Sequence, residues 1–188
     1  MNKLNASGFT LIELMVGVAV LAIALGAGAP SMSEFIQNSR LAVQTNDLIA
    51  SLHLARTEAI KRNARVTVCR SASGTTCNTT AGTGWEIGWI VFADAANFGI
   101  ADAGEVVLDS RGVAANNVAI APRAADTIDN FVSYTSRGVL RDSAGVAQSG
   151  VFRVCDERGI GHARGLVLSA TGRVEFTRDP VALGACPP

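Results

Sequence analysis

The chain opens with an apolar segment that contains a single charged residue. No charged or strongly polar side chain occurs from Leu14 to Ala29, and the segment from Phe9 to Ala29 reaches the roughly 20 residues that cross a bilayer. Glu13 lies inside this segment. A charge at that depth costs a few kcal/mol and therefore needs a partner. The pattern predicts a membrane-spanning helix over residues 9–30 that contacts something beyond lipid.

The charges around this segment predict its orientation. Lys3 precedes the apolar run, and the next basic residue is Arg40. Basic residues favour the cytoplasmic side, so the N-terminus is expected in the cytoplasm and the body of the chain outside it. An ordinary secretory signal has its small-residue cleavage site after the apolar stretch. Here the small residue Gly8 comes before it, so cleavage would leave the apolar segment attached.

Beyond this segment the pattern predicts a second helical stretch. Pro30 removes a backbone donor and predicts a kink or a locally melted turn. Ser31 or Ser33 can cap a renewed helix that runs to about Asn63, which makes residues 31–63 its amphipathic half. Its apolar face is spaced by three and four residues and comprises Leu41, Thr45, Leu48, Leu52, Ala55 and Ala59.

From Arg65 onward the periodicity changes to that of strands. Residues 64–188 are expected to form one β-rich head, because the chain of 188 residues suits a single domain plus the anchor. The predicted fold class is α+β, with one long helix packed on antiparallel sheet and with Trp85 and Trp89 in its core. Strands are expected at 65–69, 85–92, 105–110, 117–121, 131–135, 151–155, 165–169 and 173–177.

The four cysteines all lie in the exported body. An even number of thiols in an oxidising compartment favours disulfides. Three pairings are possible, and we favour a short Cys69–Cys77 loop with a longer Cys155–Cys186 loop. The alternative is a zinc site, which lacks support because no Cys-x-x-Cys or clustered histidine accompanies the thiols.

The start of the chain resembles a known processing signal. Residues 8–13 read Gly-Phe-Thr-Leu-Ile-Glu, ahead of the apolar run, and resemble the cleavage site of type IV prepilins and type II secretion pseudopilins. The resemblance implies that residues 1–8 are a leader, that prepilin peptidase cuts after Gly8, and that Phe9 becomes a methylated N-terminus. It also implies that Glu13 pairs with the terminal amine of a neighbouring subunit.

The body is similar to the GspH/FimT branch of minor pilins and pseudopilins. The likeness lies in residues 55–63, 66–69 and 88–92, in Gly-Arg-Val at 172–174, and in the final Cys186. It implies a pilin-like fold in a subunit that helps to initiate or cap a type IV pilus or a type II secretion pseudopilus. The implied location is the inner membrane with a periplasmic head. The implied partners are other pilins, prepilin peptidase and the membrane, with no cofactor.

Some members of this branch bind double-stranded DNA during natural transformation through a Gly-Arg-x-Arg motif. Here Glu175 stands in place of the second arginine, and Arg178 is the nearest substitute for it beside Arg173. The 16 basic and 16 acidic residues balance, so general attraction to nucleic acid is not expected. The basic segments 56–70 and 137–178 would form a patch if they met in space. A DNA-binding pilin is therefore the alternative function.

No other motif predicts a cofactor or catalysis. Residues 94–105 superficially resemble a calcium loop, but apolar residues occupy ligand positions, so a turn between two strands is expected instead. His53 and His162 have no neighbouring nucleophile in the sequence, and no phosphate-binding loop occurs. The chain is not expected to be an enzyme or to bind a metal.

Overall fold

The computed structural model describes residues 8–124 and 126–187, and it describes residues 24–31 by their backbone alone. One helix, α1 (Leu11–Arg62), runs without interruption through Pro30. The expected melted turn and the renewed helix capped by Ser31 or Ser33 are therefore wrong. The kink at Pro30 stays a prediction, since its ring lies outside the described side chains. The helix ends at Arg62, close to the expected Asn63.

The chain divides into two compact units, residues up to Asn38 and residues from Ser39 onward. The second unit contains the C-terminal half of α1 and the whole β region. In this half every residue of the predicted apolar face is buried, with exposed fractions of 0–1%. This apolar face explains why the segment is helical, because its apolar residues recur with the helical period and are all buried when the helix packs on the sheets. The prediction of this face is confirmed.

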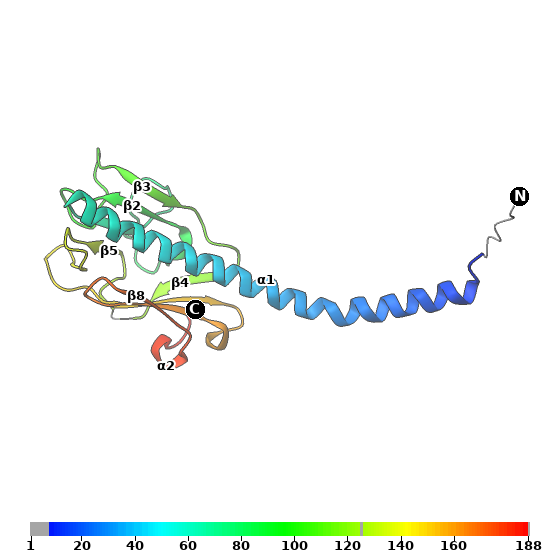
Figure 1. Ribbon diagram of the computed structural model, residues 1–188. Coiled ribbons are helices and arrows are strands. Elements are labelled where there is room, and N and C mark those ends of the chain that lie inside the picture. The colour runs from blue at the N-terminus through cyan, green and yellow to red at the C-terminus, as the bar shows by residue number, and fades with distance from the viewer. Residues whose placement is uncertain (1–7, 125, 188) are drawn as a thin grey trace, which may run out of the picture. The chain divides into compact units, whose positions relative to one another are not determined.

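The β region is built from two four-stranded antiparallel sheets in place of one. The first has the order β3-β2-β1-β5, and the second has the order β4-β6-β7-β8. In Figure 1, β2 and β3 lie on one side of the C-terminal half of α1, and β4 and β8 lie on the other. The strands are β1 (Val66–Arg70), β2 (Trp89–Ala93), β3 (Val107–Arg111), β4 (Val118–Pro122), β5 (Phe131–Tyr134), β6 (Gly150–Asp156), β7 (Arg164–Leu168) and β8 (Val174–Thr177).

Each of the predicted strands has a counterpart, but the one expected at 85–92 is only half right. Residues Trp85–Ile87 form a short 3-10 helix, η1, and β2 begins after Gly88. Gly88 has a φ of 106°, which a residue with a side chain rarely adopts, and a Cβ there would collide with the carbonyl oxygen of Arg111. The glycine therefore separates η1 from β2, so the strand begins only at Trp89 although the aromatic pattern suggested an earlier start.

One core joins the helix and both sheets. The expected core positions of Trp85 and Trp89 are confirmed: Trp85 packs edge-on against Phe152 of β6, with ring centroids 4.8 Å apart. Trp89 donates its indole N–H to Ser51 Oγ of α1 at 2.9 Å. Burial of a polar indole is inexpensive only when it finds such a partner. The two tryptophans thus connect η1 with the second sheet and β2 with the helix.

Two disulfides close the head, and they are the pairing favoured from the sequence. Cys69 is bonded to Cys77, and Cys155 is bonded to Cys186. Cys69 packs with Ile90 and Phe92 on the face of the first sheet away from the main core. Cys155 packs with Val151 and with Leu183 of the short helix α2 (Pro180–Leu183) in a separate cluster. Each bridge therefore fastens a covering segment over the outer face of one sheet.

The bridge Cys155–Cys186 should contribute more stability than Cys69–Cys77. A disulfide restricts the unfolded chain more when it closes a longer loop, and the two separations are 31 and 8 residues. Replacing Cys155 and Cys186 by Ala is expected to lower the free energy of unfolding by about 3–4 kcal/mol, against about 2–3 kcal/mol for the Cys69/Cys77 pair. Urea unfolding of the full chain in detergent measures both. The reverse order would contradict the expectation.

Candidate functional site: the exposed N-terminal helix

The N-terminal part of α1 exposes a long apolar surface. Phe9 is 84% exposed, and Val16, the least exposed of the large apolar side chains before residue 24, is still 55% exposed. Monomeric proteins usually scatter such residues singly, and a contiguous patch marks an interaction site. The members are Phe9, Leu11, Ile12, Leu14, Met15, Val16, Val18, Val20, Leu21 and Ile23.

A threonine that the sequence reading overlooked organises the start of this helix. Thr10 Oγ1 accepts the backbone N–H of Glu13 at 3.3 Å, and the Thr10 carbonyl accepts that of Leu14 at 3.2 Å. The first N–H groups of a helix lack partners, and a threonine followed three residues later by glutamate is a known signal for capping them. This spacing could have identified Thr10. The cap places Glu13 in the first helical turn, where the helix dipole favours a negative charge.

The carboxylate of Glu13 has no cationic partner in the described residues. None of the ion pairs found in residues 8–124 and 126–187 includes it. Gly8 and Phe9 precede the helix and are exposed, so a protease could reach the bond between them. The leader residues 1–7 lie outside the described part of the chain. Processing after Gly8 and the pairing of Glu13 therefore stay predictions.

No helix within the described residues is both long and apolar enough to cross a membrane. The expected membrane-spanning role of residues 9–30 stays a prediction.

The two arginines considered for DNA binding are already engaged within the chain. Arg173 Nε lies 2.9 Å from Glu175 Oε1, and the Arg178 guanidinium lies 5.6 Å from the centre of the Phe176 ring. Glu175 thus neutralises Arg173, as its position in the motif suggested. Gly172, which precedes Arg173, has a φ of 79° in the tight turn between β7 and β8, and a Cβ there would collide with the Gly138 carbonyl. The glycine of this motif therefore has a structural role.

The two basic segments do meet, but their cations are largely used internally. Arg56 donates to the Thr171 carbonyl at 3.4 Å, and Arg65 donates to the carbonyls of Arg141 and Asp142 at 3.0 and 2.9 Å. Glu58 accepts from both Lys61 and Arg62, and its hydrogen bond with Arg62 is the main cause of its lowered pKa. Arg70 is 1% exposed and donates to the Thr80 and Thr83 carbonyls and to Asn130. These bonds stabilise loops and leave little positive charge for a phosphate.

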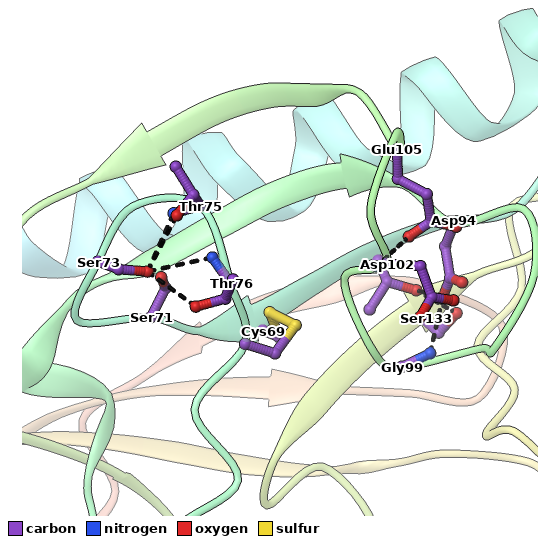
Figure 2. The surroundings of a disulfide bond; sticks show 12 residues. Cys69, Ser71, Ser73, Thr75, Thr76, Asp94, Gly99, Asp102, Glu105 and Ser133 are labelled. Carbon is purple, nitrogen blue, oxygen red and sulfur yellow. Dashed lines mark hydrogen bonds between the residues drawn. A yellow bond between two sulfur atoms is a disulfide. The ribbon is translucent and has the colours of Figure 1, made fainter.

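Residues 94–105 form the turn between β2 and β3 that was expected, and their carboxylates bind the loop's own backbone. Asp94 Oδ2 accepts from Gly99 N–H at 2.8 Å and from the Thr67 hydroxyl. Glu105 accepts from the N–H groups of Ala95 and Asp102 at 2.7 and 2.9 Å. Figure 2 shows these side chains turned into the loop beside β1 and β2. Carboxylates used in this way are not directed toward a common cation.

Burial gives Asp94 the strongest electrostatic perturbation in this loop. The side chain is 1% exposed, and its Oδ1 has no hydrogen-bond partner among the described residues. Desolvation raises the pKa of the carboxyl, while the bonds from Thr67 and Gly99 and the charge of Arg65 oppose the rise. Arg65 in turn lies 4.0 Å from the centre of the Phe98 ring. The network holds the loop against β1.

Neither histidine belongs to a reactive group of side chains. His53 is exposed on α1, and His162 is exposed in the 3-10 helix η2 (Ile160–His162). Within residues 8–124 and 126–187, no three His, Cys, Asp or Glu side chains lie close enough together to hold a metal ion.

Two protein families match the sequence. Residues 44–172 match the family described as type II transport protein GspH, and residues 3–29 match the prokaryotic N-terminal methylation motif. No curated protein matches the chain.

Solved structures share the fold. The type IV minor pilin FimU of Pseudomonas aeruginosa, in one crystal form, is 19% identical, with a TM-score of 0.57 over 81% of this chain and 96% of that one. A second crystal form of FimU gives 17% identity and a TM-score of 0.52 over 75% and 93% of the two chains. At this identity the likeness concerns the fold alone, and it confirms the predicted α+β, pilin-like class.

Replacing Asp94 by Asn should remove a pH-dependent contribution to stability. Because burial raises the pKa of the folded carboxyl above 3.8, the folded state holds this proton more tightly than the unfolded chain does. The contribution is complete below about pH 3.8 and is lost as the pH rises through the raised folded value. The unfolding free energy of the native chain minus that of Asp94→Asn should therefore fall as the pH rises.

Urea titrations of the full chain at several pH values measure this difference. Asp102→Asn, which alters a carboxylate of the same loop that accepts from Asn97, controls for the loss of one charge. Identical pH profiles for the native chain and Asp94→Asn would contradict the expectation.

Proposed function

We propose that this chain, which belongs to the GspH family of type II transport proteins, is a minor subunit that helps to initiate or cap a pilin-like filament. The family and the fold shared with a minor pilin support a structural role in a type IV pilus or a type II secretion pseudopilus. The observation that carries the proposal is the exposed apolar surface of residues 9–23, next to a head that buries its own core completely. The N-terminal part of the helix is therefore the surface that we expect to contact other subunits.

The physical basis of assembly is burial of this surface between parallel helices of neighbouring subunits. Burying apolar surface contributes roughly 25 cal/mol per Å², and ten large side chains here are more than half exposed. Such contacts are strong, but they depend little on how far one helix is shifted along its neighbour. The Glu13 carboxylate would fix the axial offset between neighbouring helices. Once it is buried between helices, its charge is compensated only at the offset that places it opposite a cation.

The N-terminal amine of a neighbour is the cation we infer. Cleavage after Gly8 would create this amine on Phe9, two residues before the helix begins at Leu11. None of the ion pairs within residues 8–124 and 126–187 includes the Glu13 carboxylate, so it stays available. An amine on an incoming subunit would meet this carboxylate at one axial offset. The match of residues 3–29 to the N-terminal methylation motif supports this chemistry.

The same features support a location at the inner membrane with the head in the periplasm. The methylation motif belongs to precursors that prepilin peptidase processes, and the apolar segment would hold the subunit in the membrane before assembly. The two disulfides suit an oxidising compartment. Other pilins or pseudopilins are the partners we propose, and no catalytic role is included because the family is structural.

A DNA receptor is not our proposal for this chain. The ion pair of Arg173 with Glu175 and the internal bonds of Arg56, Arg65 and Arg70 leave no aligned row of cations for phosphates. Binding of this kind would appear as affinity that falls steeply with salt.

Glu13→Val should leave processing intact and impair assembly. The variant keeps the apolar surface but loses the charge that sets the register. We expect mature, methylated protein in normal amount, measured by mass spectrometry, and a loss of co-purification with neighbouring subunits from the membrane. Glu34→Val removes an exposed carboxylate further along α1 and is the matched control. Normal co-purification of Glu13→Val would contradict the proposal.

A deletion strain should lose one filament function and keep the others. Surface pili, exoprotein secretion and DNA uptake are scored together, with the native gene restored as the control. Loss of pili alone would identify the filament as a type IV pilus, and loss of secretion alone would identify it as a type II secretion pseudopilus. A strain that keeps both while losing DNA uptake would overturn the structural role in favour of the receptor.

A further inference from the structure

The strand pairing shows which backbone groups of β8 face away from its sheet. Ser169 N–H donates to the Arg173 carbonyl at 3.0 Å, in the same register that pairs Val167 with Glu175 and Gly165 with Thr177. Hydrogen-bonded pairs alternate along an antiparallel ladder. Glu175 and Thr177 therefore bond to β7, whereas Val174 and Phe176 direct their N–H and C=O groups outward.

Two of the other sheet edges are closed by side chains. On β4 the outward N–H of Ile120 donates to Glu86 Oε2 at 3.1 Å, and the next outward position, Pro122, has no N–H. On β5 the Gln148 side chain accepts from Ser133 N–H and donates to the Phe131 carbonyl, both at 3.0 Å. These contacts occupy the groups with which another strand would pair.

The edge at β3 is protected in another way. Its pairing with β2 shifts register between Val91 and Phe92, and such a bulge twists an edge away from regular pairing. Asp109 and Arg111 also form an ion pair along this strand, with 3.2 Å between Oδ2 and Nε. A regular partner strand would meet this bulge, which β8 lacks.

In the described part of the chain, the edge of β8 has neither a closing side chain nor a bulge, although Arg173 and Glu175 form an ion pair beside it as Asp109 and Arg111 do on β3. Within residues 8–124 and 126–187, no group hydrogen-bonds to the outward N–H or C=O of Val174 or Phe176. Phe176 is 49% exposed, while Val174 is partly buried against the main core and fixes the strand in place. An ordered strand with free backbone groups and an exposed aromatic ring is a template for strand addition.

Arginines lie at both ends of this edge, and Glu175 neutralises the one at its start. Arg173 precedes β8 and Arg178 follows it, and Arg164 lies across from Arg178 at the start of β7. Burial is the main cause that lowers the pKa of Arg164, and the positive charges of Arg178 and Arg158 lower it further. The positive charge available to a strand added at this edge is therefore that of Arg178, which none of the ion pairs within residues 8–124 and 126–187 includes. Opposite charges across a strand pair are stabilising, so the edge favours an acidic strand.

We propose that the free edge of β8 binds an extended acidic segment of a partner protein, which adds as a further strand to the second sheet. The segment bonds through its backbone to Val174 and Phe176, places an apolar side chain against the Phe176 ring, and carries carboxylates toward Arg178. A second copy of β8 fits less well, because it would bring the same arginines to the interface. This surface is separate from the apolar helix and does not depend on it.

Hydrogen exchange of the full chain in detergent micelles tests the edge directly. Without a partner, the amides of Val174 and Phe176 should exchange fast and those of Glu175 and Thr177 slowly. The probe is a nine-residue peptide of alternating Val and Thr with Asp at both ends. It should slow exchange at Val174 and Phe176 by about tenfold or more, as a hydrogen bond worth about 1.4 kcal/mol would. The same peptide N-methylated at alternate residues, on the edge that faces β8, should have no effect.

Variants separate backbone pairing from charge. Val174→Pro removes an outward N–H that makes no bond to β7, and it should weaken peptide binding by about tenfold. Arg178→Gln should weaken it by about threefold, whereas Arg123→Gln, at the opposite edge of the same sheet, should not.

Three results would overturn the proposal. They are equal protection by the peptide and its N-methylated form, unchanged affinity of a folded Val174→Pro, and protection of Val174 and Phe176 that rises with protein concentration in the absence of peptide. The last result would show that a second copy occupies the edge. Should Val174→Pro fail to fold, the exchange pattern of the native chain with the two peptides decides.

Discussion

The head depends on one buried stripe of α1 that both sheets share. Leu48, Leu52 and Ala55 are inaccessible to solvent and belong to the same cluster as Val68 of the first sheet and Phe152 of the second. The inner faces of both sheets are buried against this helix face, which lies in the same core cluster as residues of each sheet. The alanines at positions 55 and 59 keep the helix surface shallow, so that the strands can approach closely. The Trp89–Ser51 hydrogen bond then fixes the rotation of the helix about its own axis.

The same helix carries a second apolar surface that its own chain does not cover. Residues 9–23 have the composition of a protein interior, yet their side chains are mostly exposed. The buried core of the head and the exposed apolar surface of the helix together fit the filament subunit that we propose. The head buries its core within its own chain, whereas the exposed helix can bury its apolar surface only against other molecules. In the assembly that we propose, Glu13 turns this non-directional attraction into a defined offset.

Much of the fold could be predicted because it follows from periodicity. The spacing of Leu41, Leu48 and Leu52 predicts the buried helix face, and alternation predicts the strands. Features that depend on contacts between distant segments could not be predicted. The split into two sheets follows from which strands pair, and Gly88 delays the start of β2 through a φ of 106° that composition does not reveal. At the candidate site, Glu13 was visible as a costly charge, whereas the role of Thr10 required attention to its three-residue spacing. Arg173 was in doubt because of Glu175, and the ion pair gives the physical reason.

The treatment of sheet edges bears on how a head can be specific within a filament. Apolar helices provide affinity, and many pilin-like chains would satisfy them equally, so the choice of neighbour has to come from the head. The side chains of Glu86 and Gln148 hydrogen-bond to the outward backbone groups of β4 and β5. Stability alone does not require these bonds, because water could hydrogen-bond to the same groups at little cost in free energy. Closure of this kind prevents unwanted strand pairing. Once β4 and β5 are closed and β3 is bulged, the free backbone edge in the described part of the head is β8, where we propose that Arg178 helps to discriminate among partners. Selectivity by the head and adhesion by the helix can thus change independently of each other.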